Sequence, residues 1–439
     1  MSKFSRFIYF ILVFYVAISV SLNVIPSGAH AEVTLYVTVD GAGNMDGTSW
    51  ENAARDLKGL IDNLNGNADI WVAKGVYSPG TGSEDTFSLK KGLKIYGGFD
   101  GTESVLEERD TKKNAVFLDG GKISRKVPVV TARSGATSDD TRLDCITITG
   151  GVNITNGGGL FVEINSNPLI TECVFTDNMA HIGGGGLYIY YSSPIIQNCT
   201  FAGNKTLDEN GGGVINYYAS PIFGNCVFQN NEAVYGGGLF NYGSITEVVN
   251  CTFSDNRSSF RGAGMSNFDS TVVVSGGAFT GNHGEEYGGG MHNEDSRAEI
   301  RNCVFSNNRA SPGNGGGIAS LNSSVEIAEC KFTMNEADFY GGGMAGINSS
   351  LKISGCVFSE NKALRIGGGG MVIWQSTVTI DNSRFFGNTA RTGRDIFNRD
   401  SFPVIENSVF SGDKIIDLIH DEGENSKTIL NNCEISSKR

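Results

Sequence analysis

Hydrophobic and polar positions recur along this chain with a period of about 26 residues. One phenylalanine marks each repeat, and consecutive members of this series stand 25 to 27 residues apart. Asparagine stands three residues after nine of these phenylalanines, and Asp413 takes that place after the tenth. The series is Phe175, Phe201, Phe228, Phe253, Phe279, Phe305, Phe332, Phe358, Phe385 and Phe410. A self-similar unit of this length indicates a solenoid in which each coil stacks on the preceding one.

Each repeat also carries a run of glycines, usually a triplet such as 211–213, followed at once by one apolar residue. Residues two apart in a strand point to the same side, so short runs such as Cys-Val-Phe-Ser predict half-buried strands. The glycines and asparagines between these runs predict turns. The pattern therefore predicts an all-β parallel β-helix over residues 69–435, with regular coils from residue 145. The apolar residues after the glycines are Leu160, Leu187, Val214, Leu239, Met265, Met291, Ile318, Met344, Met371 and Ile396.

The nine cysteines follow the same register. Cys145 and Cys433 stand two residues before Thr147 and Ile435, which occupy the phenylalanine position of their repeats. The other seven precede a repeat phenylalanine by two residues: Cys173, Cys199, Cys226, Cys251, Cys303, Cys330 and Cys356. Cysteine on that face behaves as a small buried hydrophobe. Because neighbouring Cβ atoms in a ladder point in parallel rather than toward each other, we expect mostly free, buried thiols.

Both ends of such a stack need protection, because an open end exposes strand edges and core. Residues 32–68 are expected to form an N-terminal cap with a helix at about 51–65, capped by Thr48 or Ser49. The first coils are expected at 70–77, 87–89, 93–99 and 116–118. Toward the other end, residues 420–424 are expected to interrupt a coil, and residues 436–439 to form a polar tail that discourages pairing.

Composition narrows the alternatives. Glycine supplies 60 of 439 residues, about twice its usual share. Each glycine inside a helix costs about 1 kcal/mol relative to alanine, which excludes a helical bundle. The glycines do not fall at every third position, which excludes collagen. The net charge of −13 argues against a nucleic-acid-binding surface, which needs clustered lysine and arginine.

The N-terminus predicts export. Lys3 and Arg6 precede an apolar run over residues 7–20, and small residues at 29–31 offer a cleavage site. This is the layout of a secretory signal peptide over residues 1–31. An uncleaved N-terminal anchor is the alternative, although the run is shorter than the roughly 20 residues that a spanning helix needs. No second apolar run long enough to span a membrane follows in the sequence, so we expect a secreted or cell-surface protein.

Phe-x-x-Asn alternating with Gly-Gly-Gly-aliphatic resembles the repeats of chlamydial-type polymorphic outer membrane proteins and other bacterial right-handed parallel β-helix proteins. Those repeats pair Phe-x-x-Asn with Gly-Gly-Ala-aliphatic, whereas here the third residue is almost always glycine. Residues 47–53, 70–77 and 96–103 are also similar to the start of such exported proteins. The resemblance implies a right-handed, single-stranded, pectin-lyase-like solenoid with an outer-membrane-associated or adhesion role. The same fold also hosts polysaccharide lyases and glycoside hydrolases.

One register carries aromatic residues at a position that is predicted to face outward. Three residues after the apolar ladder stand Tyr190, Tyr217, Tyr242 and Phe268, and Trp374 returns to the position later. If the ladder residue points inward, this position points outward. Such a column suits stacking on sugar rings or anchoring of a protein partner. The alternative is an aromatic stack that only stabilises a corner of the coil.

Asp269 and Asp295 stand one coil apart, so their carboxylates are predicted to lie about 4.8 Å from each other, close enough to share a calcium ion. The competing interpretation is that they are turn residues. The same register holds Asn322, Asn348 and Asp400, each followed by serine, as turn-forming side chains are. His292 is expected to be a solvated strand residue rather than a base.

The coils vary little in length, so no inserted loop is available to wall a catalytic cleft. We therefore expect an exported, non-catalytic β-helix with a cell-surface or adhesion role, no catalytic residues, and no cofactor apart from calcium. A cell-surface protein or a polysaccharide is the expected partner, nucleic acid is not, and the chain is expected to be a monomer. The alternative is a carbohydrate-active enzyme, either a polysaccharide lyase or a glycoside hydrolase.

Overall fold

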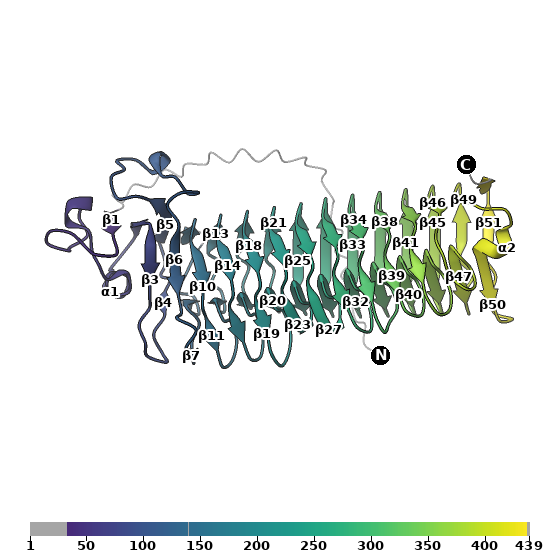
Figure 1. Cartoon of the computed structure of the whole chain (residues 1–439), viewed down its shortest axis with the longest axis horizontal. Coiled ribbons are helices and arrows are strands. Elements are labelled where there is room, and N and C mark those ends of the chain that lie inside the picture. Colours follow the sequence, from purple (N-terminus) through teal and green to yellow (C-terminus); the bar gives the residue numbers. More distant parts are fainter. Residues whose placement is uncertain (1–32, 139, 437–439) are drawn as a thin grey trace, which may run out of the picture. The chain divides into compact units, whose positions relative to one another are not determined.

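Short strands joined by tight turns build each coil of the computed structural model, which describes residues 33–436 except 139. One coil runs through β24 (Leu239–Tyr242), β25 (Ile245–Val249), β26 (Thr252–Ser254) and β27 (Arg257–Arg261). Each strand pairs in parallel with its counterpart in the next coil, as Leu239 of β24 does with Met265. The counterparts form four sheets of 15, 14, 13 and 10 strands. Figure 1 shows these strands side by side in sequence order, so the predicted parallel β-helix is confirmed.

We name the sheets by the strands of that coil: sheet A contains β25, sheet B β26, sheet C β24 and sheet D β27. The phenylalanine series lies on the inner face of sheet B and is completely buried. Its rings stack nearly in parallel, with centroids of neighbouring rings 4.5 to 5.1 Å apart. A repeat written into the sequence thus becomes a continuous core column.

The asparagines that follow the phenylalanines form a second buried column. In each coil the side-chain amide donates to the Oδ1 atom of the next asparagine; Asn256 Nδ2 lies 3.0 Å from Asn282 Oδ1. The same amide donates to the phenylalanine carbonyl of the preceding coil, as Asn282 does to Phe253 at 2.9 Å. The column ends at Asn388, which donates to Asp395 Oδ1 at 2.8 Å, while Asp413 is exposed.

The cysteines are free thiols, as predicted. The seven that precede a repeat phenylalanine are buried, whereas Cys145 and Cys433 are partly exposed. A typical member, Cys251, directs its Sγ atom toward the carbonyl oxygen of Phe223 at 3.5 Å. Burial raises the pKa of the Cys199 thiol well above its ordinary value. The Cys199 thiol is therefore a poor nucleophile.

The glycine triplets serve two purposes. The first glycine turns the backbone through positive φ, as Gly211 does at 66°. The third glycine has ordinary dihedrals but faces the next coil, where a Cβ atom on Gly213 would lie 2.5 Å from the carbonyl oxygen of Gly238. The turn requirement inferred from the sequence therefore explains only part of the triplet, and close backbone approach explains the rest.

The N-terminal helix is shorter than the predicted 51–65. It is α1 (Leu57–Asp62), and Asp56, rather than Thr48 or Ser49, caps it by accepting from the Gly59 N–H. Trp50–Asn52 forms only a turn of 3-10 helix. The backbone just before α1 does not continue the helix, because Ala54 pairs with Val37 at the end of β1 (Val33–Val37). Leu57 and Ile61 of α1 are buried against the core.

The solenoid also begins earlier than residue 69, because β1 pairs with β2 (Ala68–Ala73) and opens sheet A. The next strands fall close to the predicted segments. They are β3 (Gly75–Tyr77), β4 (Phe87–Ser88), β5 (Leu93–Phe99) and β6 (Val116–Asp119). The predicted signal peptide at 1–31 lies outside the described residues.

The C-terminal coil is continuous, which corrects the expected interruption at 420–424. After α2 (Ile415–Leu418), β50 (Ile419–Glu422) pairs with β47 (Ile396–Arg399) and completes sheet C. The final strands are β51 (Ile429–Asn431) and β52 (Glu434–Ser436), and the rest of the predicted polar tail lies outside the described residues. In the described part of the chain, no helix has the length and apolar character needed to cross a membrane.

Candidate functional site

Sheet C carries the aromatic positions that the sequence singled out. Along β16 (Leu187–Tyr190), Leu187 and Ile189 belong to the buried core, whereas Tyr188 and Tyr190 lie on the outer face with a separate aromatic cluster. The predicted outward direction of the Tyr190 register is therefore correct. The site strands that follow are β20 (Val214–Tyr217), β24, β28 (Met265–Phe268), β32 (Met291–Glu294), β36 (Ile318–Leu321), β40 (Met344–Ile347) and β44 (Met371–Trp374).

Three of the five predicted aromatic residues form a continuous partly exposed column. The ring centroids of Tyr190 and Tyr217 are 5.9 Å apart, and those of Tyr217 and Tyr242 are 5.0 Å apart at an interplanar angle of 13°. Phe268 turns instead toward Tyr235, with the rings edge to face at 5.4 Å. Trp374 lies four strands further along, where the Arg399 guanidinium covers its ring at 4.7 Å. Trp374 is thus not part of the same surface.

A further outer-face column was not anticipated. Tyr188, Ile215 and Phe240 point away from the core but are nearly buried, at 8%, 4% and 4% exposure. Tyr235, the last residue of β23 (Glu232–Tyr235) in sheet D, packs over this face with its ring centroid 6.2 Å from that of Phe240. The more exposed side chains of Tyr190, Tyr217 and Tyr242 pack against this buried column.

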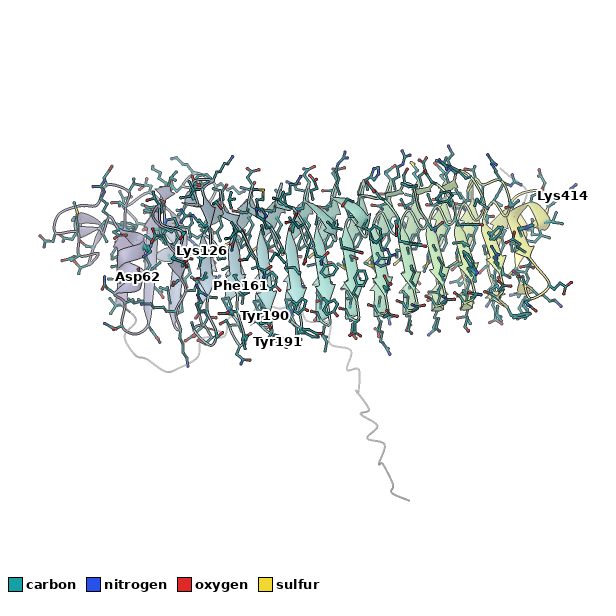
Figure 2. All side chains as sticks on the ribbon, turned by 90° about the horizontal axis from the view of Figure 1, so that it is seen from below. Asp62, Lys126, Phe161, Tyr190, Tyr191 and Lys414 are labelled. Carbon is teal, nitrogen blue, oxygen red and sulfur yellow. The ribbon has the colours of Figure 1, made fainter. Side chains whose placement is uncertain are left out.

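Two tyrosines at the turn after sheet C were also not predicted from the sequence pattern. Tyr191 and Tyr218 are 45% and 40% exposed, and their rings stack at 5.2 Å with an interplanar angle of 19°. Figure 2 shows Tyr191 next to Tyr190 at one margin of the solenoid, and their ring centroids are 4.7 Å apart. A Tyr-Tyr pair repeated 27 residues later was the available signal. We call Tyr190, Tyr191, Tyr217, Tyr218 and Tyr242 the tyrosine ledge.

A pocket of about 580 Å³ opens beside the tyrosine ledge. Its lining consists of Ile164, Asn165, Tyr190, Tyr191, Ser192, Ser193, Tyr218 and Ser220. A neighbouring pocket of about 370 Å³ shares Ser193 and Ser220 with it and adds the exposed side chains of Ile195 and Ile222. The two pockets are therefore adjacent, and none of their lining residues carries a formal charge.

The calcium candidates Asp269 and Asp295 are stacked in the predicted register. Both have positive φ, 47° and 50°, and Asp269 N–H donates to the carbonyl oxygen of Glu294. The serines that follow continue the turn, with Ser270 N donating to Ser296 Oγ at 3.1 Å. These contacts support the turn interpretation. Over residues 33–436 apart from 139, no group of three or more acidic, histidine or cysteine side chains is placed to hold a metal ion, and shared calcium binding stays a prediction.

His292 is not the solvated residue that the sequence suggested; it is completely buried on the outer face of sheet C. Its Nδ1 atom lies 3.3 Å from Ser266 Oγ, and its Nε2 atom lies 3.6 Å from Glu294 Oε2. Arg261 covers the group and binds Glu294 at 2.5 Å. Burial, followed by the Arg261 charge, lowers the pKa of His292 well below its ordinary value. Because Ser266 is also fully buried, its hydroxyl is not accessible to a substrate.

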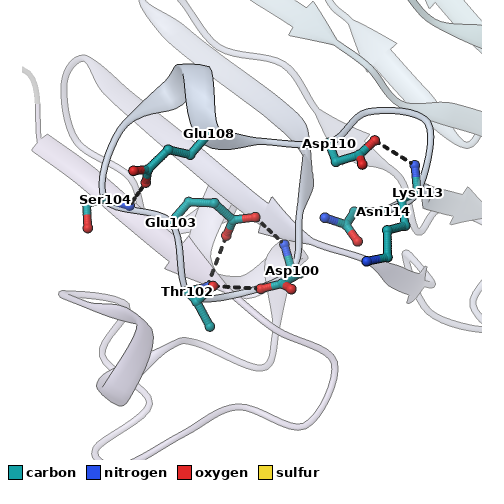
Figure 3. A pocket seen from close by; sticks show the side chains of 8 residues that line it. All are labelled: Asp100, Thr102, Glu103, Ser104, Glu108, Asp110, Lys113 and Asn114. Carbon is teal, nitrogen blue, oxygen red and sulfur yellow. Dashed lines mark hydrogen bonds between the residues drawn. The ribbon is translucent and has the colours of Figure 1, made fainter.

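A third pocket, of about 400 Å³, lies in the acidic loop after β5 (Figure 3). Its carboxylates are used locally: Glu103 accepts from the backbone N–H groups of Asp100, Gly101 and Thr102. Glu108 accepts from the backbone N–H of Ser104. Backbone N–H groups that bind a carboxylate shape the loop and leave fewer oxygen atoms for a ligand. We therefore regard the tyrosine ledge as the stronger candidate site.

Comparisons with known proteins agree with this architecture. The family model described as right handed beta helix region matches residues 136–293 and 283–410. The search of curated proteins finds no significant match to this chain. The A-module of the mannuronan C-5 epimerase AlgE6 from Azotobacter vinelandii superposes with a TM-score of 0.51 at 11% identity, covering 87% of this chain and 95% of that one.

Two further solved structures are more distant. The surface adhesin PfbA of Streptococcus pneumoniae has a TM-score of 0.31 at 10% identity, covering 92% of this chain and 93% of that one. Pectate lyase Pel9A has a TM-score of 0.28 at 12% identity, covering 85% and 76%. At these identities the likeness concerns the fold alone. With the family model matching more than half of its length, the chain belongs to the right-handed β-helix family.

Proposed function

We propose that this chain is an exported, non-catalytic β-helix protein with a cell-surface or adhesion role, and that it binds its ligand at the tyrosine ledge. The observation that carries the proposal is the grouping of five tyrosines from three consecutive coils at one corner, beside a pocket of about 580 Å³. A polysaccharide or a cell-surface protein is the partner, and the chain acts as a monomer.

Aromatic side chains suit such a role because each offers a large rigid apolar face together with a polar hydroxyl. Exposed aromatic clusters beside hydrogen-bonding groups are also the anchors on which protein partners dock. Here the ledge rests on the buried column of Tyr188, Ile215 and Phe240. A supported surface of this kind loses little conformational freedom when a ligand binds, which favours affinity.

We propose that the protein is not catalytic because of where its carboxylate and imidazole groups lie. The pocket beside the ledge is lined by residues without carboxylate or imidazole groups. The one serine–histidine contact on sheet C, between Ser266 and His292, is buried. We propose export because residues 1–31 have the sequence pattern of a secretory signal peptide, which would direct the protein to the cell surface.

Replacing Tyr217 and Tyr242 by alanine tests the proposal. Each substitution removes one aromatic face from the ledge, so affinity for the bound ligand should fall at least about tenfold. Because both side chains are partly exposed, the melting temperature should stay within about 2 °C of the wild-type value. A glycan array identifies the ligand, and calorimetric titration and thermal melting follow the variants.

Tyr340→Ala is the matched control, because Tyr340 is also partly buried and packs against the outer face of sheet C but lies away from the ledge. Its variant should bind ligand normally. If Tyr217→Ala and Tyr242→Ala lose stability while ligand affinity is unchanged, the tyrosines are a structural stack and the proposal fails.

The enzymatic alternative is tested separately with a product assay on polyuronides. We expect no turnover by the wild-type protein. Turnover that Asp269→Asn or Asp295→Asn abolishes would replace the proposal with a carbohydrate-active enzyme.

A further inference from the structure

The turn after sheet C holds one residue per coil in the left-handed region. Asp269, Asp295, Asn322 and Asn348 occupy this position in four consecutive coils, with φ between 47° and 51°. Aspartate and asparagine tolerate this conformation because their short side chains bind the local backbone. The position is thus normally filled by turn residues.

Tyr191 and Tyr218 occupy the same turn position with φ of 46° and 49°. Tyrosine has no local hydrogen bond to offset the strain there, and such a conformation costs on the order of 1 kcal/mol or more. Two neighbouring coils therefore depart from the favoured residue type at one place, and both departures put an aromatic ring on the same surface. Strained backbone of this kind concentrates at ligand-binding positions.

The two rings differ in which of their faces is available. Tyr218 packs over Gly243 of the following coil, where an added Cβ atom would lie 2.4 Å from the Tyr218 ring. The other face of Tyr218 stacks on Tyr191. On the preceding coil the equivalent position holds Asn165, a shorter side chain that lines the pocket beside Tyr191. The stack thus presents the outer face of Tyr191 to the pocket.

The hydrogen-bonding groups around this face are neutral. Asn165, Ser193 and Ser220 are exposed and line the pocket, and Asn167 Oδ1 accepts from the Ser193 N–H at 2.7 Å. The eight lining residues include no lysine, arginine, aspartate or glutamate. A carboxylated or sulfated sugar would find no cation there, and the net charge of −13 repels polyanions at a distance.

The size of the two adjacent pockets fits more than one sugar ring. The pocket at Tyr191, about 580 Å³, lies within the range of about 300–1,000 Å³ that small-ligand sites occupy. Ser193 and Ser220 also line the adjacent pocket of about 370 Å³, whose lining includes Ile195, Ile222 and Pro168. An apolar extension of this kind suits the C–H faces of the next units in a chain.

From these observations we infer that the ligand of the tyrosine ledge is a neutral glycan, one pyranose ring of which stacks on the open face of Tyr191 while Asn165, Ser193 and Ser220 bind its hydroxyls. This inference rests on the proposed function and specifies its ligand class. It also names Tyr191 as the binding residue that the sequence pattern had not indicated.

The probes for the test are the hexasaccharides of cellulose, xylan, mannan and chitin on the neutral side, and polygalacturonate and alginate on the acidic side. Wild-type protein should bind at least one neutral hexasaccharide in calorimetric titration, and either polyuronide at least tenfold more weakly. Tyr191→Asn should lower the affinity for the neutral hexasaccharide at least tenfold. Its melting temperature should be equal to or higher than the wild-type value, because asparagine is favoured at this φ.

Two further variants test whether the effect of Tyr191→Asn comes from loss of the aromatic ring at the pocket. Tyr191→Phe keeps the ring and should keep the affinity within threefold. Gln375→Asn changes the same turn position, with φ of 48°, in a coil that does not line the pocket, and should bind as wild type does.

The outcomes distinguish a failure of the inference about the ligand class from a failure of the proposed function. If a polyuronide binds as tightly as any neutral probe, or if Tyr191→Asn retains full affinity, the inference fails while ligand binding at the ledge stands. If Tyr191→Asn loses affinity and melting temperature together, Tyr191 acts structurally and the inference fails. If no glycan binds and a cell-surface protein binds through Tyr217 and Tyr242, the inference fails and the proposed adhesion role stands.

Discussion

A single aspartate ends the asparagine column and introduces a titratable group into the core. Asp395 stands where other coils have the third glycine of the triplet, and it is 1% exposed. Asn388 donates to its Oδ1 atom at 2.8 Å, whereas Oδ2 is buried with no hydrogen-bond partner among the described residues. Burial raises the pKa of Asp395 to about 7, although the hydrogen bond from Asn388 opposes the shift.

We expect this residue to make the stability of the protein depend on pH. Because the pKa is higher in the folded state than in the unfolded state, the folded state binds the proton more tightly between about pH 4 and 7. The contribution is fully present below about pH 4 and is lost as the pH rises through about 7. This contribution is on the order of 4 kcal/mol. Asp395→Asn should remove this loss, so that urea denaturation gives a higher free energy of unfolding than wild type at pH 8.

The control for this prediction is Asp413→Asn, which changes an exposed aspartate at the same end of the chain. Its difference in unfolding free energy between pH 5 and pH 8 should match that of the wild type. An Asp395→Asn protein with an unchanged difference would show that Asp395 is ionised in the fold at little cost.

At the scale of elements, the asparagine column joins each coil to its neighbours through buried amides. Asn282 is completely buried, accepts from the N–H and Nδ2 of Asn256, and donates to Phe253 O and Asn308 Oδ1. Asn282→Ala would leave several of these groups buried and unpaired. Because each such group costs about 1–3 kcal/mol, the free energy of unfolding should fall by at least about 3 kcal/mol in urea denaturation.

Asn322→Gly provides the comparison, since Asn322 is an exposed turn residue with φ of 49° that glycine also adopts. That variant should change the free energy of unfolding by less than about 0.5 kcal/mol. Equal effects of the two substitutions would mean that the buried amides contribute no more than turn residues do.

The sequence predicted elements well wherever a repeat fixed their register. The phenylalanine, cysteine and asparagine columns follow from the period alone, because equivalent residues of a parallel solenoid must stack. The predicted helix at 51–65 was too long, because Ala54 pairs with Val37, a contact between separate segments that helical spacing does not report. The burial of His292 was missed for a similar reason, since the side chains that cover it, such as Arg261, come from another part of the coil.

The candidate site was predicted only in part. Tyr190, Tyr217 and Tyr242 were found because they stand three residues after the apolar ladder, on the opposite face of the same strands. Tyr191 and Tyr218 were not, because a left-handed turn breaks the alternation of the strand, and the strain of tyrosine at this turn position becomes visible only when φ is known. The sequence did not show that Trp374 lies apart from these tyrosines, because that depends on the residues of the four strands between β24 and β44.

At the scale of the whole described chain, the two ends of the stack differ. At the N-terminal side α1 buries Leu57 and Ile61 against the core. At the C-terminal side Leu430 and Ile435 are in register with the core residues Ile405 and Phe410, yet they are 39% and 44% exposed. Within residues 33–436 the last coil therefore has a neighbouring coil on one side only.

We expect hydrogen exchange to reflect this difference. In a solenoid each coil contacts only its neighbours, so local opening is easiest where one neighbour is missing. Amides of β50–β52 should exchange faster than those of their equivalents in sheets A, B and C near the middle of the stack. Mass spectrometry of peptic fragments gives the comparison, with the fragment that contains β34 (Val304–Ser306) as the equivalent of β52. Equal protection of both fragments would contradict the prediction.

The pairing of each coil with only its two neighbours also bears on how such a protein changes during evolution. The residues that line the pocket at Tyr191 come from three successive coils, within residues 164–220. Duplicating or deleting one coil of about 26 residues elsewhere would alter the reach of the molecule by one strand spacing, about 4.8 Å. The pocket would keep its geometry. The length of the solenoid and the geometry of the pocket are therefore separable by inheritance, because gain or loss of a coil elsewhere changes the first and leaves the second unchanged.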